Sequence, residues 1–378
     1  MREYYAASLS AFFDAVREIA EKEAEDNRNG VKQDRNTDGR DIPLLWYRGL
    51  TENSYTLLPT LYRSEPEFNK LLAYNQVRQK EDARYQHFKS RTYHLIKSNP
   101  DLENEWLEIY QHHRGKTRLL DWSESAKTAL SFAVEDFLDT RNEEKQKGGR
   151  ATSTPTVTVI NPSRLNRKAY QYFYQHEEII RDAVSELFPG DSVGCMAASQ
   201  KMRDNMEQYE NILFSAPEDI EMGGVLSLCV LEDMRDMAGS QFKQRITSME
   251  FNPFHYLALR YYTDALPVLI ESDTAPILPP LAILHPYHSE RIRKQRGTFS
   301  IYPNYVLSKR MQELKEKRGI DARTMESQWD INSLLSRIYI TNPAEVAKEL
   351  LYAGERRTEL YPGLDDHAWR LETQMYYV

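Results

Sequence analysis

The densest group of chemically active side chains in this sequence lies at residues 111–125, QHHRGKTRLLDWSES. It combines imidazoles, carboxylates, cations, an indole and hydroxyls, and it comes just before small apolar residues spaced as in a helix that packs closely on a sheet. Hydrolysis through His112 and Asp121 would need a nucleophile or a metal set beside this pair, and the segment offers no clear nucleophile and no metal set. We therefore rank it last among the candidate chemistries.

Several of these residues also have a purely structural interpretation. Asp121 followed by Glu124 fits a helix N-cap with its capping-box partner, and a nearby serine could cap the helix instead. Arg118 and Asp121 flank two leucines, so a local ion pair would explain both. In an extended segment His112 and His113 would point to opposite sides, so at most one would face a cleft.

A second candidate element is the segment LLWYRGL at residues 44–50, an apolar strand that ends in Arg48 and Gly49. The planar guanidinium of an arginine suits two-pronged contact with a phosphate or carboxylate. A glycine beside it lets a ligand or another part of the chain approach the backbone. The alternative interpretation of Arg48 is a buried arginine with a structural role.

Composition excludes several classes of protein. The formal net charge of −8 argues against affinity by broad phosphate neutralisation, and no window approaches the roughly 18 apolar residues of a membrane span. Two cysteines, Cys195 and Cys229, cannot form a disulfide framework or a four-thiolate zinc site. Charged residues interrupt any signal-peptide core near the N-terminus. We expect a cytoplasmic protein without a bound metal or a membrane partner.

The elements that must position these residues follow from periodicity. The spacing predicts a helix over residues 4–25, a polar loop to about residue 40, helices within 66–97 and a helix after Ala126. Short strands are expected at IPLLWYRG, VTVIN, GVLSLCVL, LPVLIES, LAILHP and TFSIY. Because no regular βαβ alternation appears, we predict an α+β fold with a mixed or antiparallel central sheet and N-terminal helices.

The order and spacing of several motifs resemble the FRG domain. They are WYRG at 46–49, LLPTLYR at 57–63, QHH at 111–113 with TRLLDWS at 117–123, ALSFA at 129–133, VINP at 159–162, the RI, Q and GTF residues at 291–299, and LYPGLD at 360–365. TRLLDWS is the most specific of these. The resemblance implies an N-terminal helix and loop at 1–40 and an FRG domain at 41–378. Residues 164–224 are longer than the family core, and we expect a helical insertion there.

The motif order is also distantly similar to the ADP-ribosyltransferase fold, which implies NAD as a substrate. In that case Arg48 would bind a phosphate or ribose hydroxyl, Ser123 would orient the nicotinamide ribose, and a tyrosine or Trp122 would stack on the ring. Gln295 would hydrogen-bond the ribose, and Glu290 would supply the carboxylate because an amide cannot act as a general base. The family resemblance implies a setting in bacterial defence or toxicity, with a protein or nucleic acid as acceptor.

A non-catalytic binding module is the alternative function. Its pocket would sense a nucleotide or another phosphorylated ligand through convergent cations and their neighbours: Arg48, Arg63, His112, Arg118 and Asp121. The two functions differ in geometry, because a transferase of this kind requires Arg48, Ser123 and Gln295 to share one cleft.

Overall fold

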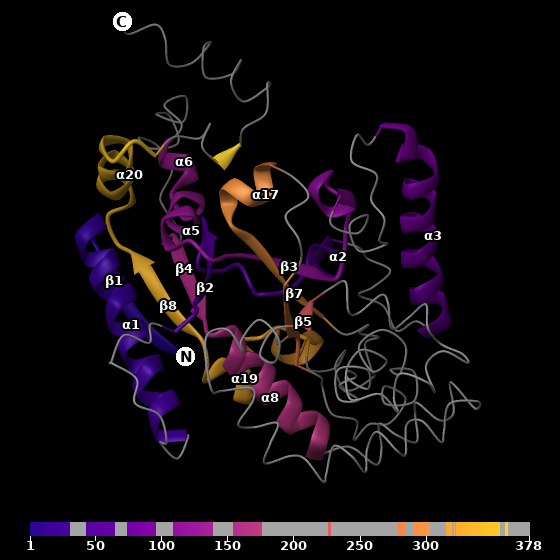
Figure 1. Cartoon of the computed structure of the whole chain (residues 1–378), viewed down its shortest axis with the longest axis horizontal. Coiled ribbons are helices and arrows are strands. Elements are labelled where there is room, and N and C mark those ends of the chain that lie inside the picture. Colours follow the sequence, from indigo (N-terminus) through magenta and orange to yellow (C-terminus); the bar gives the residue numbers. More distant parts are fainter. Residues whose placement is uncertain are drawn as a thin grey trace, which may run out of the picture.

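The computed structural model describes residues 1–30, 43–64, 74–95, 109–138, 154–175, 226–227, 279–284, 290–302, 315–319, 321, 323–355 and 360–361. These residues form one mixed sheet with helices on its faces, which confirms the predicted α+β class (Figure 1). Within these ranges no helix has the length and apolar character needed to cross a membrane.

The sheet has eight strands in the order β1-β8-β4-β2-β3-β7-β6-β5. All neighbours among the inner strands pair antiparallel, whereas β1 with β8 and β6 with β5 pair parallel at the two edges. The strand bounds are β1 Arg2–Ala6, β2 Trp46–Leu50, β3 Leu119–Ser123, β4 Thr156–Ile160, β5 Leu226–Ser227, β6 Leu281–Leu284, β7 Gly297–Ile301 and β8 Ser336–Ile340.

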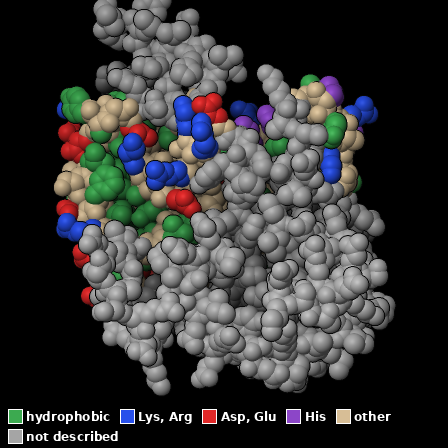
Figure 2. Space-filling view, viewed as in Figure 1, with side chains coloured by type: hydrophobic (Ala, Val, Ile, Leu, Met, Phe, Trp, Pro, Cys, Tyr) green, Lys and Arg blue, Asp and Glu red, His purple; other side chains and the backbone are tan. Residues whose placement is uncertain are grey.

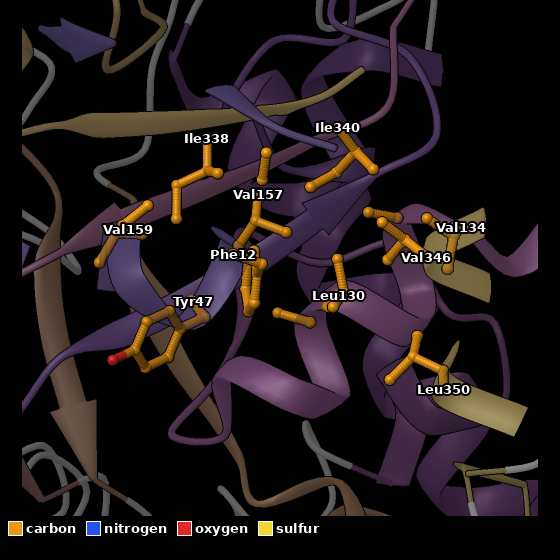
Figure 3. Close-up of a cluster of buried hydrophobic side chains, with 14 of the residues drawn as sticks. Phe12, Tyr47, Leu130, Val134, Val157, Val159, Ile338, Ile340, Val346 and Leu350 are labelled. Carbon is orange, nitrogen blue, oxygen red and sulfur yellow. The ribbon is translucent and has the colours of Figure 1, made fainter. Parts of the chain in front are cut away.

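Helices α1 (Leu9–Gly30), α5 (Ala126–Ala133) and α20 (Pro343–Tyr352) cover one face of the sheet around β2, β4 and β8. Apolar side chains from both layers form the hydrophobic core, and Figure 3 shows how they meet. The strands contribute Tyr47, Val157, Val159, Ile338 and Ile340, and the helices contribute Phe12, Leu130, Val346 and Leu350 among others. We call this face of the sheet the core face.

Helix α5 lies unusually close to β2. A Cβ atom added to Gly49 would stand only 1.9 Å from the main-chain oxygen of Ala129 and 2.7 Å from the nitrogen of Ala133. Gly49 and the two alanines therefore let helix and strand backbones touch. This confirms the close helix packing that the small residues predicted. Of the two partners considered for Gly49, a ligand or another part of the chain, the one that approaches its backbone is the main chain of α5.

The other helices lie around the remaining strands. Helix α8 contacts β6 and α19, and α17 contacts β7. Asn166 of α8 fixes this contact, because its side-chain amide both donates to and accepts from the main chain of Ala282 in β6 at 3.0 and 2.8 Å. The remaining bounds are α2 Thr60–Ser64, α3 Tyr74–Thr92, η2 Tyr93–Leu95, α6 Glu135–Leu138, α8 Pro162–Gln175, α17 Glu290–Gln295 and α19 Trp329–Asn332.

The N-terminus differs from the sequence prediction. Residues 2–6 form β1 instead of the start of a helix, and the helix begins only at Leu9. Ser8 precedes it and accepts a hydrogen bond from the Ala11 N–H at 3.2 Å, as an N-cap does. Strand β1 forms because it pairs with β8, a partner more than 300 residues away that local periodicity cannot reveal.

Parts of two other predictions fall outside the described residues. Helix α8 occupies the start of the expected insertion at 164–224, and residues 176–224 are not described. The expected strand LPVLIES also lies outside the described ranges, and only residues 226–227 of the run GVLSLCVL are described, as β5. The other predicted strands correspond to β2, β4, β6 and β7.

Candidate anion-binding site

The sheet is weakly joined between β2 and β3. These strands share the single register pair Tyr47 with Ser123, whereas β2 with β4 and β3 with β7 share five pairs each. Arg48 reaches across the place where β2 and β3 separate, and its Nη1 donates to the main-chain oxygen of Asp121 at 2.5 Å. The guanidinium thus occupies a position where sheet hydrogen bonds would otherwise be expected.

The Asp121 side chain links Arg48 to the loop before β3. One carboxylate oxygen lies 3.7 Å from Arg48 Nη1, and the other accepts a hydrogen bond from the Gln111 amide at 2.5 Å. The Gln111 oxygen in turn accepts from the Thr117 hydroxyl. The Asp121 side chain is 61% exposed, whereas that of Arg48 is only 16% exposed. Two motifs far apart in the sequence therefore meet at one mostly enclosed cation.

Arg63 supplies a second cation at the rim of this site. Partial burial lowers the pKa of its guanidinium, and repulsion from Arg48 lowers it further, while attraction from Asp121 opposes both effects. Arg63 Nη2 donates to the Thr60 hydroxyl at 3.2 Å on the same short helix, α2. Two arginines therefore act on one carboxylate, which leaves the site with an excess of positive charge.

The segment that carries Arg63 is held by hydrogen bonds from distant residues. The Leu57 N–H donates to both carboxylate oxygens of Glu326, at 2.9 and 3.1 Å, and the Leu57 carbonyl accepts from the Tyr302 hydroxyl at 2.7 Å. The Leu61 N–H donates to the main-chain oxygen of Thr117 at 3.4 Å. Burial raises the pKa of Glu326, in keeping with the low solvent exposure of its contact with Leu57.

A buried ion pair lies behind the same segment. The Arg323 side chain is fully buried and its guanidinium stands over the Tyr62 ring at 5.3 Å from the centroid. Asp321 accepts from Arg323 Nε at 2.8 Å and from Nη2 at 2.6 Å. These hydrogen bonds and the nearby positive charges outweigh desolvation and lower the pKa of Asp321 to about 2. The pair packs against α2 through Tyr62.

Ser123 and Gln295 lie together, but through the main chain. The Ser123 hydroxyl is buried, donates to the Gln295 carbonyl at 2.6 Å and accepts from the Ser125 N–H at 3.0 Å. The Gln295 side-chain amide donates to the Leu360 carbonyl at 2.8 Å. Among the described residues, the Arg48 guanidinium contacts Asp121, two residues before Ser123 in β3, and the recorded contacts of Ser123 and Gln295 do not include it.

The other candidate residues occupy different surroundings. Glu290 starts α17 with 61% of its side chain exposed, and its carboxylate lies 3.8 Å from the Lys294 ammonium. Trp122 is buried, and its indole N–H donates to the Ser300 hydroxyl at 3.0 Å. Neither residue stands beside the Arg48 guanidinium in a contact that the described structure records.

The expected structural roles are settled in part. The N-cap of α5 is Ser125, whose side chain accepts from the Thr128 N–H at 3.2 Å, while Asp121 lies within β3. Residues 109–112 are helical, so the extended geometry considered for His112 and His113 does not hold; their rings meet edge to face at 5.1 Å. Sequence reasoning missed Gln111 and Thr117 as partners of Asp121, although both lie in the motif.

Charged side chains of both signs lie on the described surface, where Figure 2 shows Lys and Arg interspersed with Asp and Glu. The last turn of α17 carries Arg293 and Lys294, and Arg296 follows it. Lys127 of α5 pairs with Glu355 at 2.7 Å. Within the described ranges no three His, Cys, Asp or Glu side chains come together as they would around a metal ion.

Comparison with known proteins supports the family resemblance. Residues 44–142 match the FRG domain family model. The matched stretch runs from β2 to just beyond α6 and contains Arg48, Arg63, Gln111 and Asp121. No curated protein and no solved structure matches the chain.

Proposed function

We propose that this chain, which carries an FRG domain at residues 44–142, binds a nucleotide-like ligand through a phosphate group at Arg48 and Arg63. The observation that carries the proposal is the excess of charge: two guanidinium groups act on a single carboxylate, that of Asp121, which is mostly exposed and already engaged by Gln111. A bound phosphate would balance the second cation.

The electrostatics of Arg63 give a physical reason for such a ligand. Burial and the charge of Arg48 lower its pKa, while Asp121 opposes both effects. An anion between Arg48 and Arg63 would offset their mutual repulsion and accept charge-assisted hydrogen bonds from both planar guanidinium groups. The hydrogen bond from Arg48 to Asp121 main chain already fixes the orientation of one of them.

The test is calorimetric titration of the full chain with inorganic phosphate, AMP, ADP-ribose and NAD. Replacing Arg48 with Ala should weaken binding of ADP-ribose at least ~30-fold, because truncating one member of an enclosed charged pair costs ~2 kcal/mol or more. Arg48→Lys should lose most of that affinity too, since an ammonium cannot replace the planar fork.

Arg17→Ala is the matched control, because the Arg17 side chain lies on α1 with 69% exposure. It should leave binding unchanged. The proposal fails if the wild-type chain binds none of the four compounds, or if Arg48→Ala and Arg17→Ala bind ADP-ribose equally well.

A second candidate function is cleavage of NAD, as the motif order of ADP-ribosyltransferases implies. The observation behind it is that Ser123 and Gln295, two of the residues that this motif order assigns to the site, lie in contact, the Ser123 hydroxyl donating to the Gln295 carbonyl at 2.6 Å. In the simplest reaction, water adds to the ribose carbon as the bond to nicotinamide breaks, giving ADP-ribose and nicotinamide. The site would stabilise the positive charge that develops on the sugar.

Nicotinamide release separates the two candidates. An enzyme would release nicotinamide from NAD, with or without a protein or nucleic-acid acceptor, and both Arg48→Ala and Gln295→Ala would slow the release. A binding module would take up NAD and release none. Asp121 has a carboxylate oxygen 3.7 Å from Arg48, and Glu290 is the carboxylate expected from the motif, so Asp121→Asn and Glu290→Gln would identify which of them the reaction uses.

A further inference from the structure

Polar side chains from β2, β4 and β8 form a row on the face of the sheet opposite the hydrophobic core. The strand register pairs Arg48 with Thr158, and Thr158 with Arg337. The adjacent residues Val157 and Val159 belong to the core (Figure 3), so alternation along the strands sends the three polar side chains to the other face. We call these three residues the polar row.

The polar row and its neighbours carry buried polar atoms without a hydrogen-bond partner in the part of the chain that the structure describes. These atoms are Arg48 Nε, Thr158 Oγ1, Arg337 Nε, Trp46 Nε1 and Thr156 Oγ1. Trp46 precedes Arg48 by two residues, and Thr156 precedes Thr158 by two, so all five lie on the same face. Buried polar atoms nearly always have a partner, and a concentration of them on one face points to a group from outside the chain.

The chemistry of the five atoms indicates what that group must offer. Three are N–H groups that can only donate, and two are hydroxyls that can donate. A partner rich in acceptor oxygens, such as a second phosphate or the hydroxyls of a sugar, fits this set. Arg337 is already fixed by Glu326, which accepts from its Nη2 at 3.1 Å, so its Nε is held in place.

The spacing of the strands indicates the length of the ligand. Neighbouring strands lie about 4.8 Å apart, so the backbones of Arg48 and Arg337 are separated by roughly 10 Å. A single phosphate over Thr158 could be reached by both arginines, but the five atoms also extend along the strands, because Trp46 lies level with Ile160, four residues or roughly 13 Å from Thr156. A diphosphate joined to a sugar is long enough to cover this set. Arg48 is the most exposed residue of the row, so the ligand would enter there, and it would contact the fully buried Thr158 only after the groups that cover this residue move aside.

We propose that the polar row is a second subsite of the ligand site, and that the ligand is an extended nucleotide, a dinucleotide or a nucleoside diphosphate sugar, rather than a mononucleotide. This inference rests on the proposed binding of a phosphate at Arg48. It assigns binding roles to Thr158 and Arg337, which no sequence motif singled out.

The test compares ADP-ribose with AMP on the full chain by calorimetry and thermal shift. The wild-type chain should bind ADP-ribose at least tenfold more tightly than AMP. Thr158→Val removes only the hydroxyl, and it should weaken ADP-ribose binding about tenfold, the value of one hydrogen bond to a charged or acceptor-rich group. AMP binding should not change. Thr158→Ser, which restores the hydroxyl, should recover the wild-type affinity for ADP-ribose.

A readout without ligand separates a binding role from a structural one. Because the Thr158 hydroxyl has no partner in the described chain, Thr158→Val should melt at a higher temperature than the wild type when no ligand is present. Ser131→Ala is the control: it removes a buried hydroxyl of α5 that donates to the Lys127 carbonyl at 3.0 Å, and it should change neither affinity.

Two results would overturn the inference while leaving the proposed function intact: Thr158→Val binding ADP-ribose as tightly as the wild type, or losing affinity for AMP and ADP-ribose equally. If Thr158→Val did not fold, the same comparison would be made with Thr158→Ala and Thr158→Ser. Absence of all nucleotide binding by the wild-type chain would reject the proposed function and this inference together.

Discussion

The two faces of the same three strands differ sharply. On the core face β2, β4 and β8 present Tyr47, Val159 and Ile338 to helices α1, α5 and α20, and every one of these side chains is buried among apolar neighbours. On the other face the intervening positions carry the polar row, in which each residue has a buried polar atom unpartnered within the described chain. Because side chains alternate along each strand, the same three strands place apolar side chains on the core face and the polar row on the opposite face.

The energetic consequences are opposite in sign. Burying a valine or isoleucine on the core face stabilises the fold by ~2 kcal/mol. A buried polar atom left without a partner costs ~1–3 kcal/mol. The polar row thus reduces the stability that the core face supplies, which is the pattern expected where a face is shaped for a ligand rather than for packing.

The largest change in stability is expected where α5 contacts Gly49 on the core face. Gly49→Ala would place a methyl group 1.9 Å from the Ala129 oxygen, so α5 must move away from β2. We expect a loss of ~3 kcal/mol or more in the free energy of unfolding, measured by urea denaturation. Gly297→Ala is the control, because its added atom would meet the Ile292 Cγ2 methyl at 3.0 Å and no main-chain atom nearer than 3.6 Å. Equal losses in both variants would contradict the close approach of helix and strand.

The second largest change in stability is expected at Asp321, which pairs with the buried Arg323. Asp321→Asn leaves the fully buried Arg323 without its carboxylate, which should cost ~3 kcal/mol. Asp14→Asn, beside the exposed Arg17, should cost almost nothing.

The same carboxylate should give the protein a pH dependence. The pKa of Asp321 is lowered to about 2 in the folded chain, below an unfolded value of about 3.9. Its stabilisation is therefore present above about pH 4 and is lost as the pH falls towards 2, by ~2 kcal/mol in total. Thermal unfolding from pH 5 to pH 2 measures this loss, and Asp321→Asn should lack that component.

A pair of adjacent substitutions in β4 tests the comparison of the two faces directly. Val159→Thr puts a hydroxyl into the apolar core and should cost ~2 kcal/mol. Thr158→Val removes an unpartnered hydroxyl from the opposite face and should gain up to ~1 kcal/mol. Both changes keep the side-chain shape, so denaturation midpoints report polarity alone. Two changes of the same sign would mean that the faces do not differ as described.

The smallest effect is expected at the turn between α17 and β7, outside both faces. Arg296 has a φ of 46°, a left-handed conformation that costs a residue with a side chain about 1 kcal/mol. Arg296→Gly should therefore raise the stability by ~0.5–1 kcal/mol in a urea titration. Gly354→Ala, at a φ of 83°, makes the opposite change and should lower it by a similar amount.

Local patterns predicted much of the fold and part of the site. The apolar run at 44–50 and the alternation at 156–160 became β2 and β4, and the small residues after Ala126 became the helix that touches Gly49. The WYRG and TRLLDWS motifs also singled out Arg48 and Asp121 as candidate site residues. It gave no sign that Gln111 holds Asp121, because an amide and a carboxylate ten residues apart carry no periodic signal.

The sequence by itself determined which side chains each strand sends to either face, since alternation is a local property of extended backbone. Only the tertiary structure decided which strands are neighbours. It brought β1 beside β8, joined Leu57 to Glu326 across 269 positions, and placed Arg48 against Asp121, 73 positions away. It also lined up Arg48, Thr158 and Arg337 in one row. Contacts at such separations depend on the packing of the whole chain, and no local pattern specifies them.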